Sequence, residues 1–125
     1  MVVIEQDRPA PTALPGIAHA TWAGSAEGLS QLSLWRQSLA PGGGTPPHSH
    51  DCDEVVLCLG GAGEVHIDGR AHGFGADCTI VLPKGMLHRI VNVGALPLEI
   101  LGIFPATPVA VYLPDGQAIE VPWRS

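Results

Sequence analysis

Short apolar runs, separated by glycine, proline and aspartate, recur along this chain and constrain its fold more than any other feature. The runs are rich in valine, isoleucine and leucine, and almost none shows the 3.6-residue period of an amphipathic helix. We therefore expect strands at 17–22, 29–39, 54–59, 63–68, 78–82, 87–93, 96–104, 109–113 and 118–122. Many short strands at this spacing predict an all-β sandwich or barrel.

Two tight turns support this interpretation. Asp68-Gly69 and Pro114-Asp115-Gly116 each place a glycine between two strand-like segments, as β-hairpins require. A chain of 125 residues is long enough for one domain with a real core and too short for two. We expect a single domain over 1–125, with an irregular, proline-rich N-terminal arm over 1–16.

Composition excludes several classes of partner. The chain carries a net charge of −6, and its six basic residues are scattered singly, so we expect no nucleic-acid partner. No apolar run approaches the roughly 18 residues of a membrane span, and no export signal is visible, so we expect a cytoplasmic protein without a membrane partner.

The three cysteines, Cys52, Cys58 and Cys78, cannot all pair within one chain and lack CxxC spacing. We expect reduced thiols, with Cys58 and Cys78 buried as small apolar groups.

The segment PPHSHDCDEVV (46–56) carries the first candidate site. On a strand, His48 and His50 would share a face about 7 Å apart, whereas Glu54 would lie roughly 13 Å further along. A turn at 51–53 would instead place Glu54 across from His50 on the next strand, about 5 Å away. Two histidines and a carboxylate form the facial set that holds iron in non-haem oxygenases and also suits manganese, nickel, cobalt or zinc.

A fourth candidate ligand, His88, follows Pro83 and Gly85 and opens another strand-like segment. We expect it to approach from the facing sheet. The remaining histidines, His19, His66 and His72, are more simply surface or hydrogen-bonded core residues. His66 and His72 flank the Asp68-Gly69 turn and are expected to face solvent.

These residues follow two spaced motifs, and with them the chain resembles a small single-domain cupin. The first motif, G-x5-H-x-H-x3-E-x6-G, is matched by Gly42, His48, His50, Glu54 and Gly61. The second, G-x5-P-x-G-x2-H-x3-N, is matched by Pro83, Gly85, His88 and Asn92, but Asp77 replaces its first glycine. The motifs span 42–92. The resemblance implies a double-stranded β-helix, or jelly-roll barrel, that is often dimeric and binds a divalent metal ion, iron, manganese, nickel or zinc, through His48, His50, Glu54 and His88.

Fold and metal together do not fix the reaction. Three neutral imidazoles and one carboxylate would leave a divalent ion with a charge near +1 and about two open positions. We expect a metal-dependent enzyme of dioxygenase type that acts on a small oxygen-bearing molecule. The alternatives are an isomerase, decarboxylase or lyase, or a non-catalytic small-molecule-binding module. No catalytic residue outside the ligands is identifiable.

Two of the expected strands raise questions of side-chain direction. In 29–39, either the Leu34, Arg36, Ser38 face or the Trp35, Gln37, Leu39 face lines the barrel. An inward Arg36 could anchor a substrate carboxylate, and an outward one is an ordinary surface residue.

In 54–59, an inward Glu54 directs Val56 and Cys58 into the barrel. The alternate residues then face outward and need a cover, which predicts a homodimer. These outward residues are Val55, Leu57 and Leu59.

Overall fold

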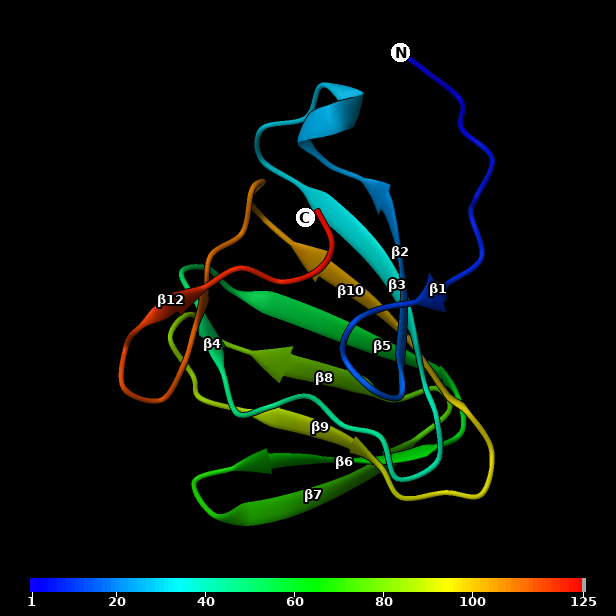
Figure 1. Cartoon of the computed structure of the whole chain (residues 1–125), viewed down its shortest axis with the longest axis vertical. Coiled ribbons are helices and arrows are strands. Elements are labelled where there is room, and N and C mark those ends of the chain that lie inside the picture. Colours follow the sequence, from blue (N-terminus) through cyan, green and yellow to red (C-terminus); the bar gives the residue numbers. More distant parts are fainter. Residues whose placement is uncertain (125) are drawn as a thin grey trace.

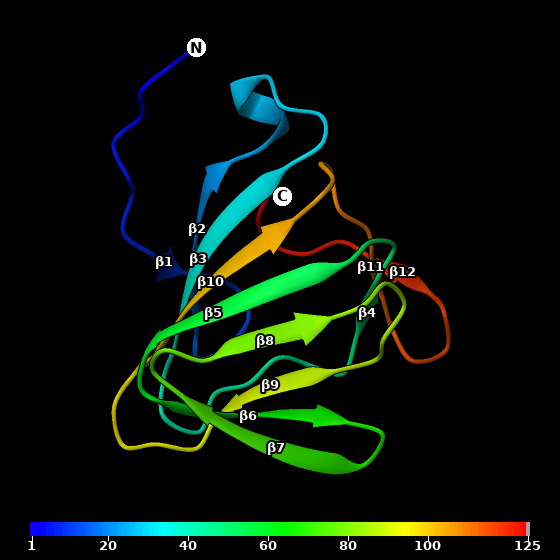
Figure 2. The same ribbon diagram turned by 180° about the vertical axis from the view of Figure 1, so that it is seen from behind.

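The computed structural model describes residues 1–124 as three antiparallel sheets wrapped into a barrel (Figures 1 and 2). The largest sheet has the order β1 (Ala10–Pro11), β2 (Ile17–Ala23), β3 (Ser33–Leu39), β10 (Leu98–Phe104), β5 (Glu54–Gly60), β8 (Thr79–Leu82). The second has the order β7 (Arg70–Gly75), β6 (Ala62–Ile67), β9 (Arg89–Asn92). The third has the order β12 (Ala118–Ile119), β11 (Val111–Tyr112), β4 (Ser49–His50). The expected all-β barrel is confirmed.

Strict alternation of side chains builds the core. Along β3, β5 and β10, buried residues alternate with more exposed ones, because successive side chains of a strand point to opposite faces. Leu39, Val56, Leu98 and Ile100 are completely buried. The core therefore lies between the six-stranded sheet and the two smaller sheets.

The expected hairpins form. Ile67 pairs with Arg70 across the Asp68-Gly69 turn, and β11 pairs with β12 across 114–116. The strand expected over 29–39 begins only at Ser33, and a 3-10 turn (Ser25–Glu27) followed by non-strand residues 28–32 precedes it. Three strands, β1, β4 and β7, were not among the predicted ranges. The arm over 1–16 is not wholly irregular, since β1 pairs with β2.

The expectation that Cys78 is buried is wrong, whereas Cys58 is buried as expected. Just before β8, Asp77 and Cys78 both face a single residue of β5, Cys58. The Asp77 amide donates to the Cys58 carbonyl, and the Cys58 amide donates to the Cys78 carbonyl. Such a bulge changes the side-chain alternation, so that Cys78 faces outward. Asp77 has a φ of 67°, so it takes the left-handed conformation that the motif's glycine would adopt.

Strand β3 directs Trp35, Gln37 and Leu39 inward. Arg36 therefore faces away from the barrel, where it pairs with Glu99 at 2.9 Å. It is unavailable as an anchor inside the barrel. Residues 1–124 contain no helix that is long and apolar enough to cross a membrane.

Candidate metal site

Backbone pairing brings the four motif residues together from three places in the chain. His48 precedes β4 and exchanges two backbone hydrogen bonds with His88, of 3.0 and 2.9 Å. His50 lies in β4 and pairs with Val111 of β11. Glu54 opens β5 and pairs with Leu82 of β8.

This arrangement corrects the expected route to Glu54. Strand β4 pairs with β11 and not with β5, so His50 and Glu54 are not cross-strand neighbours. The connection 51–53 instead carries the chain from a small sheet to the large one. Its carboxylates fasten it at both ends: Asp51 accepts a hydrogen bond from the Ala110 amide at 3.2 Å, and Asp53 accepts one from the Lys84 amide at 2.8 Å. His88 directly precedes β9 of the second sheet, and its backbone pairs with that of His48.

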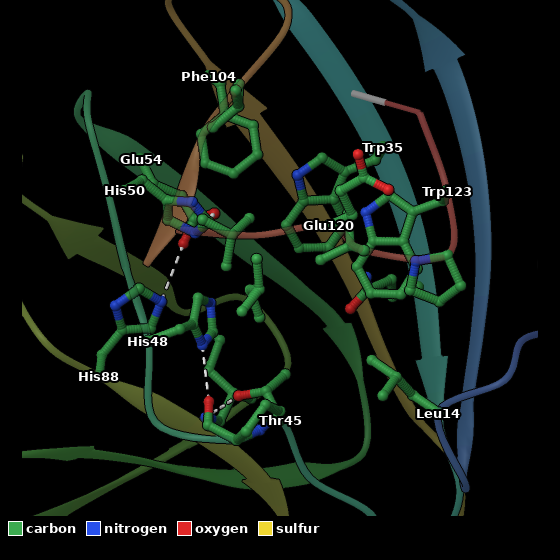
Figure 3. Close-up of a pocket in the computed structure, with 18 of the residues that line it drawn as sticks. Leu14, Trp35, Thr45, His48, His50, Glu54, His88, Phe104, Glu120 and Trp123 are labelled. Carbon is green, nitrogen blue, oxygen red and sulfur yellow. Dashed lines mark hydrogen bonds and ion pairs between the residues drawn. The ribbon is translucent and has the colours of Figure 1, made fainter. Parts of the chain in front are cut away.

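The side chains nevertheless converge. One ring nitrogen from each of His48, His50 and His88 lies within 4.8 Å of the other two, a spacing that could hold a metal ion. Glu54 completes the cluster, with its Oε2 3.6 Å from His50 Nε2 and its Oε1 3.4 Å from His88 Nε2 (Figure 3). The carboxylate thus bridges two of the three imidazoles.

Each imidazole of the cluster is oriented by a backbone carbonyl. The Nδ1 atoms of His48, His50 and His88 lie 2.7, 3.0 and 2.9 Å from the carbonyl oxygens of Pro46, Ala110 and Met86. A carbonyl can only accept a hydrogen bond, so each Nδ1 carries the proton. The Nε2 lone pair of each neutral ring is thereby left free, which is the tautomer that metal binding through Nε2 requires.

The charges of the cluster also suit a cation. Burial, together with the neighbouring His88, lowers the pKa of His48 to about 4, and burial lowers the pKa of His50. Burial acts in the same direction on His88, but the nearby Glu54 carboxylate, helped by the Met86 carbonyl at Nδ1, outweighs it and raises the pKa of His88.

One buried atom makes the fit to a metal specific. Among the described residues, His88 Nε2 is a buried polar atom without a hydrogen-bond partner, since its 3.4 Å approach to Glu54 is not a well-formed bond. An unpartnered buried nitrogen is costly. A divalent cation between the rings and the carboxylate would satisfy it, so the residues present fit a metal ion.

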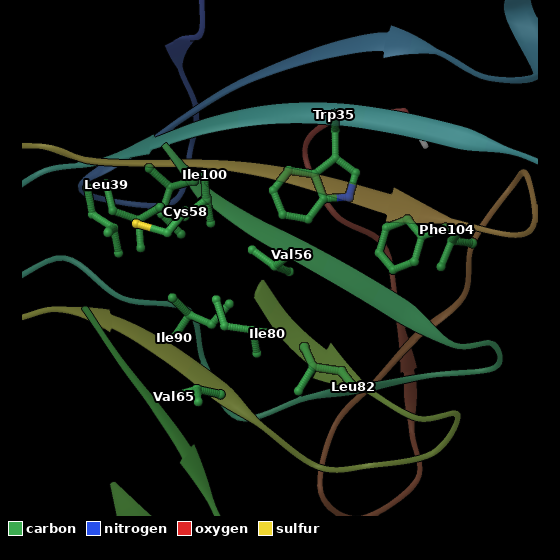
Figure 4. Close-up of a cluster of buried hydrophobic side chains, with 13 residues drawn as sticks. Trp35, Leu39, Val56, Cys58, Val65, Ile80, Leu82, Ile90, Ile100 and Phe104 are labelled. Atoms are coloured by element: carbon green, nitrogen blue, oxygen red, sulfur yellow. The ribbon is translucent and has the colours of Figure 1, made fainter. Parts of the chain in front are cut away.

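A cavity of about 110 Å³ adjoins the cluster. Its wall is continuous with the core, because Trp35, Ile100 and Phe104 belong to both (Figure 4). Trp35 and Trp123 lie across the cavity from His48 and His88 (Figure 3). The wall is thus largely apolar and aromatic around one polar end.

The C-terminal segment 119–123 supplies part of this wall, including Glu120 and Trp123. Gln37 and Thr45 add polar groups. Sequence reasoning expected a strand over 118–122, but β12 ends at Ile119. It missed the contribution of 119–123 to the cavity, because no motif or spacing indicates where this segment will run.

The other histidines stay outside the cluster. His19 is buried and hydrogen-bonded to Gln37 and Thr21, consistent with a core role. His72 is exposed as expected. His66 is half-buried and lies 3.0 Å from Glu64 on the same strand.

Comparison with known proteins agrees with this site. The family model described as "Cupin domain" matches residues 35–104. Auxin-binding protein 1 of Arabidopsis thaliana is 33% identical over 110 residues, which cover 79% of this chain and 55% of that protein. The chain therefore spans about half the length of this curated relative.

Two solved structures share the fold. One is a sugar phosphate isomerase from the cupin superfamily of Silicibacter pomeroyi, with 29% identity, a TM-score of 0.70, and coverage of 82% of this chain and 68% of that one. The other is an oxalate oxidase, with 27% identity, a TM-score of 0.69, and coverage of 79% and 56%.

Proposed function

Because this chain belongs to the cupin domain family, we propose that it holds one divalent metal ion through His48, His50, Glu54 and His88 and binds a small oxygen-bearing organic molecule beside it. The observation that carries the proposal is the unpartnered, buried Nε2 of His88, which faces a carboxylate and two further imidazoles in the metal-binding tautomer. The metal is iron, manganese, nickel or zinc, all of which accept nitrogen and carboxylate ligands.

The catalytic form of this proposal is a dioxygenase-type oxidoreductase. A bound iron ion would supply the redox chemistry, with open positions for the substrate and dioxygen. The chain's own residues orient the ligands through backbone carbonyls, and the apolar wall keeps water from the reacting molecule. An oxalate oxidase of similar fold is consistent with oxidative chemistry on this scaffold.

A second candidate function is non-catalytic binding. It is favoured by the auxin-binding relative and by the cavity lining, in which Glu54 and Glu120 are the only carboxylates among the described residues. The same lining contains no lysine or arginine within the described chain, so a phosphorylated substrate would lack a cationic side chain. This disfavours the isomerase alternative for sugar phosphates, whereas a decarboxylase or lyase of a small oxyanion stays a prediction.

The test is elemental analysis of untagged protein purified without chelator. We expect close to one divalent metal ion per chain. Iron together with oxygen uptake on a panel of diketones, thiols, flavonols and short oxyacids would support the dioxygenase. Metal with ligand-induced thermal shifts and no turnover would support the binding module. Failure to bind any metal, even after reconstitution, would contradict the proposal.

We also propose a homodimer that covers the outer face of the large sheet. The strand register places Val81, Val55, Ile103 and Leu34 in one row across β8, β5, β10 and β3, and Val81 is 66% exposed. Arg36 and Glu99 form a charged pair on this face that is neutral overall, so a second copy would meet no net repulsion from it. Light scattering at micromolar concentration tests this, and a monomer would contradict it.

A further inference from the structure

A further buried histidine lies outside the metal cluster and contacts the cavity wall from behind. His19 of β2 is 8% exposed. Its ring stacks on Trp123, with centroids 4.4 Å apart and planes 12° apart, and lies 6.0 Å from the Trp35 ring. Its Nδ1 is 3.0 Å from Gln37 Nε2, and its Nε2 is 2.8 Å from Thr21 Oγ1.

The partners of this ring fix the direction of each hydrogen bond in the series from Gln37 through His19 and Thr21 to Arg124. The Thr21 hydroxyl donates to the Arg124 carbonyl, which can only accept. Thr21 Oγ1 must then accept from His19 Nε2–H, and the Nδ1 of the neutral ring is left as an acceptor for the Gln37 amide N–H. Burial, then the charge of Arg124, lower the pKa of His19 to about 4, so the ring is neutral near pH 7.

This relay determines what Gln37 presents to the ligand. Gln37 is 4% exposed and lines the cavity, whereas His19 does not. We propose that His19 is a positioning residue that holds the Gln37 amide nitrogen out of the cavity and so presents the amide oxygen to the ligand. The inference rests on the proposed small-molecule site and deepens it.

The ligand class follows from this polarity. One end of the cavity offers a metal site that takes oxygen ligands, and the wall around Trp35 and Phe104 suits an apolar or aromatic body. The Gln37 oxygen needs a hydrogen-bond donor. We therefore expect a small, largely apolar oxyacid that also carries a hydroxyl or N–H group, because an acceptor at that position would face the lone pairs of the amide oxygen.

The first test compares matched probes on metal-loaded protein. Affinities for the hydroxybenzoates and for the corresponding fluorobenzoates are measured by tryptophan fluorescence and calorimetry. We expect the best hydroxy isomer to bind about three- to tenfold more tightly than its fluoro analogue, as one neutral hydrogen bond allows. No preference for any hydroxy isomer would overturn the inference.

Two substitutions of His19 separate positioning from packing. In His19→Asn, the side-chain oxygen can replace Nδ1 as the acceptor for Gln37, so the hydroxy preference should persist. In His19→Leu, the acceptor is lost, the amide is free to rotate, and the preference should fall to about one. An unchanged preference in His19→Leu would overturn the assignment. Glu27→Gln is the control for a loosened C-terminal segment, because it removes the charge that pairs with the Arg124 guanidinium and replaces no residue of the relay.

A second measurement needs no metal, no ligand and no variant. Nitrogen-15 NMR of the wild-type imidazoles at pH 7 reports the tautomer of each ring. We expect Nε2–H for His19, and the Nδ1–H tautomer at His19 would overturn the relay. If the protein binds no metal, the proposed function fails, and the tautomer of His19 still tests the relay. If the protein binds metal but the preference for hydroxybenzoates is the same in His19→Leu as in the wild type, only the inference about His19 fails.

Discussion

The metal cluster and the surroundings of His19 both contain buried histidines, but the ring proton is on Nδ1 in the cluster and on Nε2 at His19. In the cluster, the Nδ1 atoms of His48, His50 and His88 bond to backbone carbonyls, and Nε2 points to a shared centre. At His19, both nitrogens have side-chain partners within the protein. Burial alone therefore does not distinguish a ligand from a core histidine.

The distinction lies in what remains unpaired. A histidine whose two nitrogens are both bonded within the protein contributes to packing and orientation, since no lone pair is left for a cation. A histidine with a backbone partner on Nδ1 and a free Nε2 is prepared as a ligand. The most direct way to break this comparison is to remove one member of each group and measure metal content.

The largest effect is expected at the cluster. His50→Ala and Glu54→Ala should each weaken metal binding more than the roughly 10–100-fold that loss of an outer partner costs, because each removes a donor atom itself. His72→Ala and His19→Asn should leave the metal content unchanged. Elemental analysis after dialysis measures this, with circular dichroism as a check that the barrel still folds. Unchanged occupancy in both cluster variants would remove the metal site.

Metal removal provides the next largest effect. At a free metal concentration 100 times the dissociation constant, binding stabilises the folded state by about 2.7 kcal/mol. For a domain of this size, chelation should therefore lower Tm by about 10 °C. His50→Ala should show almost no chelator-dependent shift, whereas His19→Asn should show the full shift. A chelator-dependent shift in His50→Ala equal to that of the wild type would contradict the assignment.

The second region should show its own pH dependence. The pKa of His19 is about 4 in the folded protein and near the ordinary 6.5 when unfolded, so the unfolded chain binds more protons between these values. Stability contributed by neutral His19 is present above pH 6.5 and is lost as pH falls towards 4, by at most about 3 kcal/mol. His19→Asn cannot titrate and should lose less stability in this window. Urea unfolding of metal-free protein measures the difference, and parallel pH profiles would contradict the assignment.

The two regions are joined by aromatic rings. Trp35 lies 6.0 Å from His19 and 6.1 Å from Phe104, whose ring is 4.8 Å from that of His50. Trp35 packs over Gly102, where an added Cβ would overlap the indole. Gly102→Ala should therefore lower the free energy of unfolding by about 2 kcal/mol. It should also weaken benzoate binding in the cavity.

Gly73→Ala is the matched control, since no atom lies within 4 Å of its added Cβ. Urea denaturation of both variants measures the contrast. Equal stability of the two variants would show that Trp35 can move without cost.

Much of this comparison could be predicted from the sequence, for a physical reason. Alternation along strands fixed which residues of β5 face inward, and the motif spacing identified His48, His50, Glu54 and His88 as residues that would meet. Pairing between distant segments could not be predicted, since β4 joins β11 through contacts about 60 residues apart in sequence. The exposed side chain of Cys78 depends on a bulge, and the Trp123 wall depends on the path of the C-terminal segment. The tautomers depend on carbonyl positions that no side-chain pattern encodes. The cytoplasmic location stays a prediction.

The smallest effect is expected at the clasp that holds the C-terminal segment beside His19. Arg124 makes two hydrogen bonds to Glu27, of 2.7 and 3.0 Å, and its side chain is 50% exposed. Exposed ion pairs contribute less than about 1 kcal/mol and are screened by salt. Glu27→Gln should therefore cost little stability, and the cost should shrink in 1 M salt. A double-mutant cycle with Arg124→Gln, measured at low and high salt, isolates the pair. A larger, salt-independent coupling would mean that the Arg124–Glu27 pair, and not the stacking of His19 on Trp123, holds Trp123 against the cavity. The C-terminal segment would then have to be compared alongside the metal cluster and the surroundings of His19.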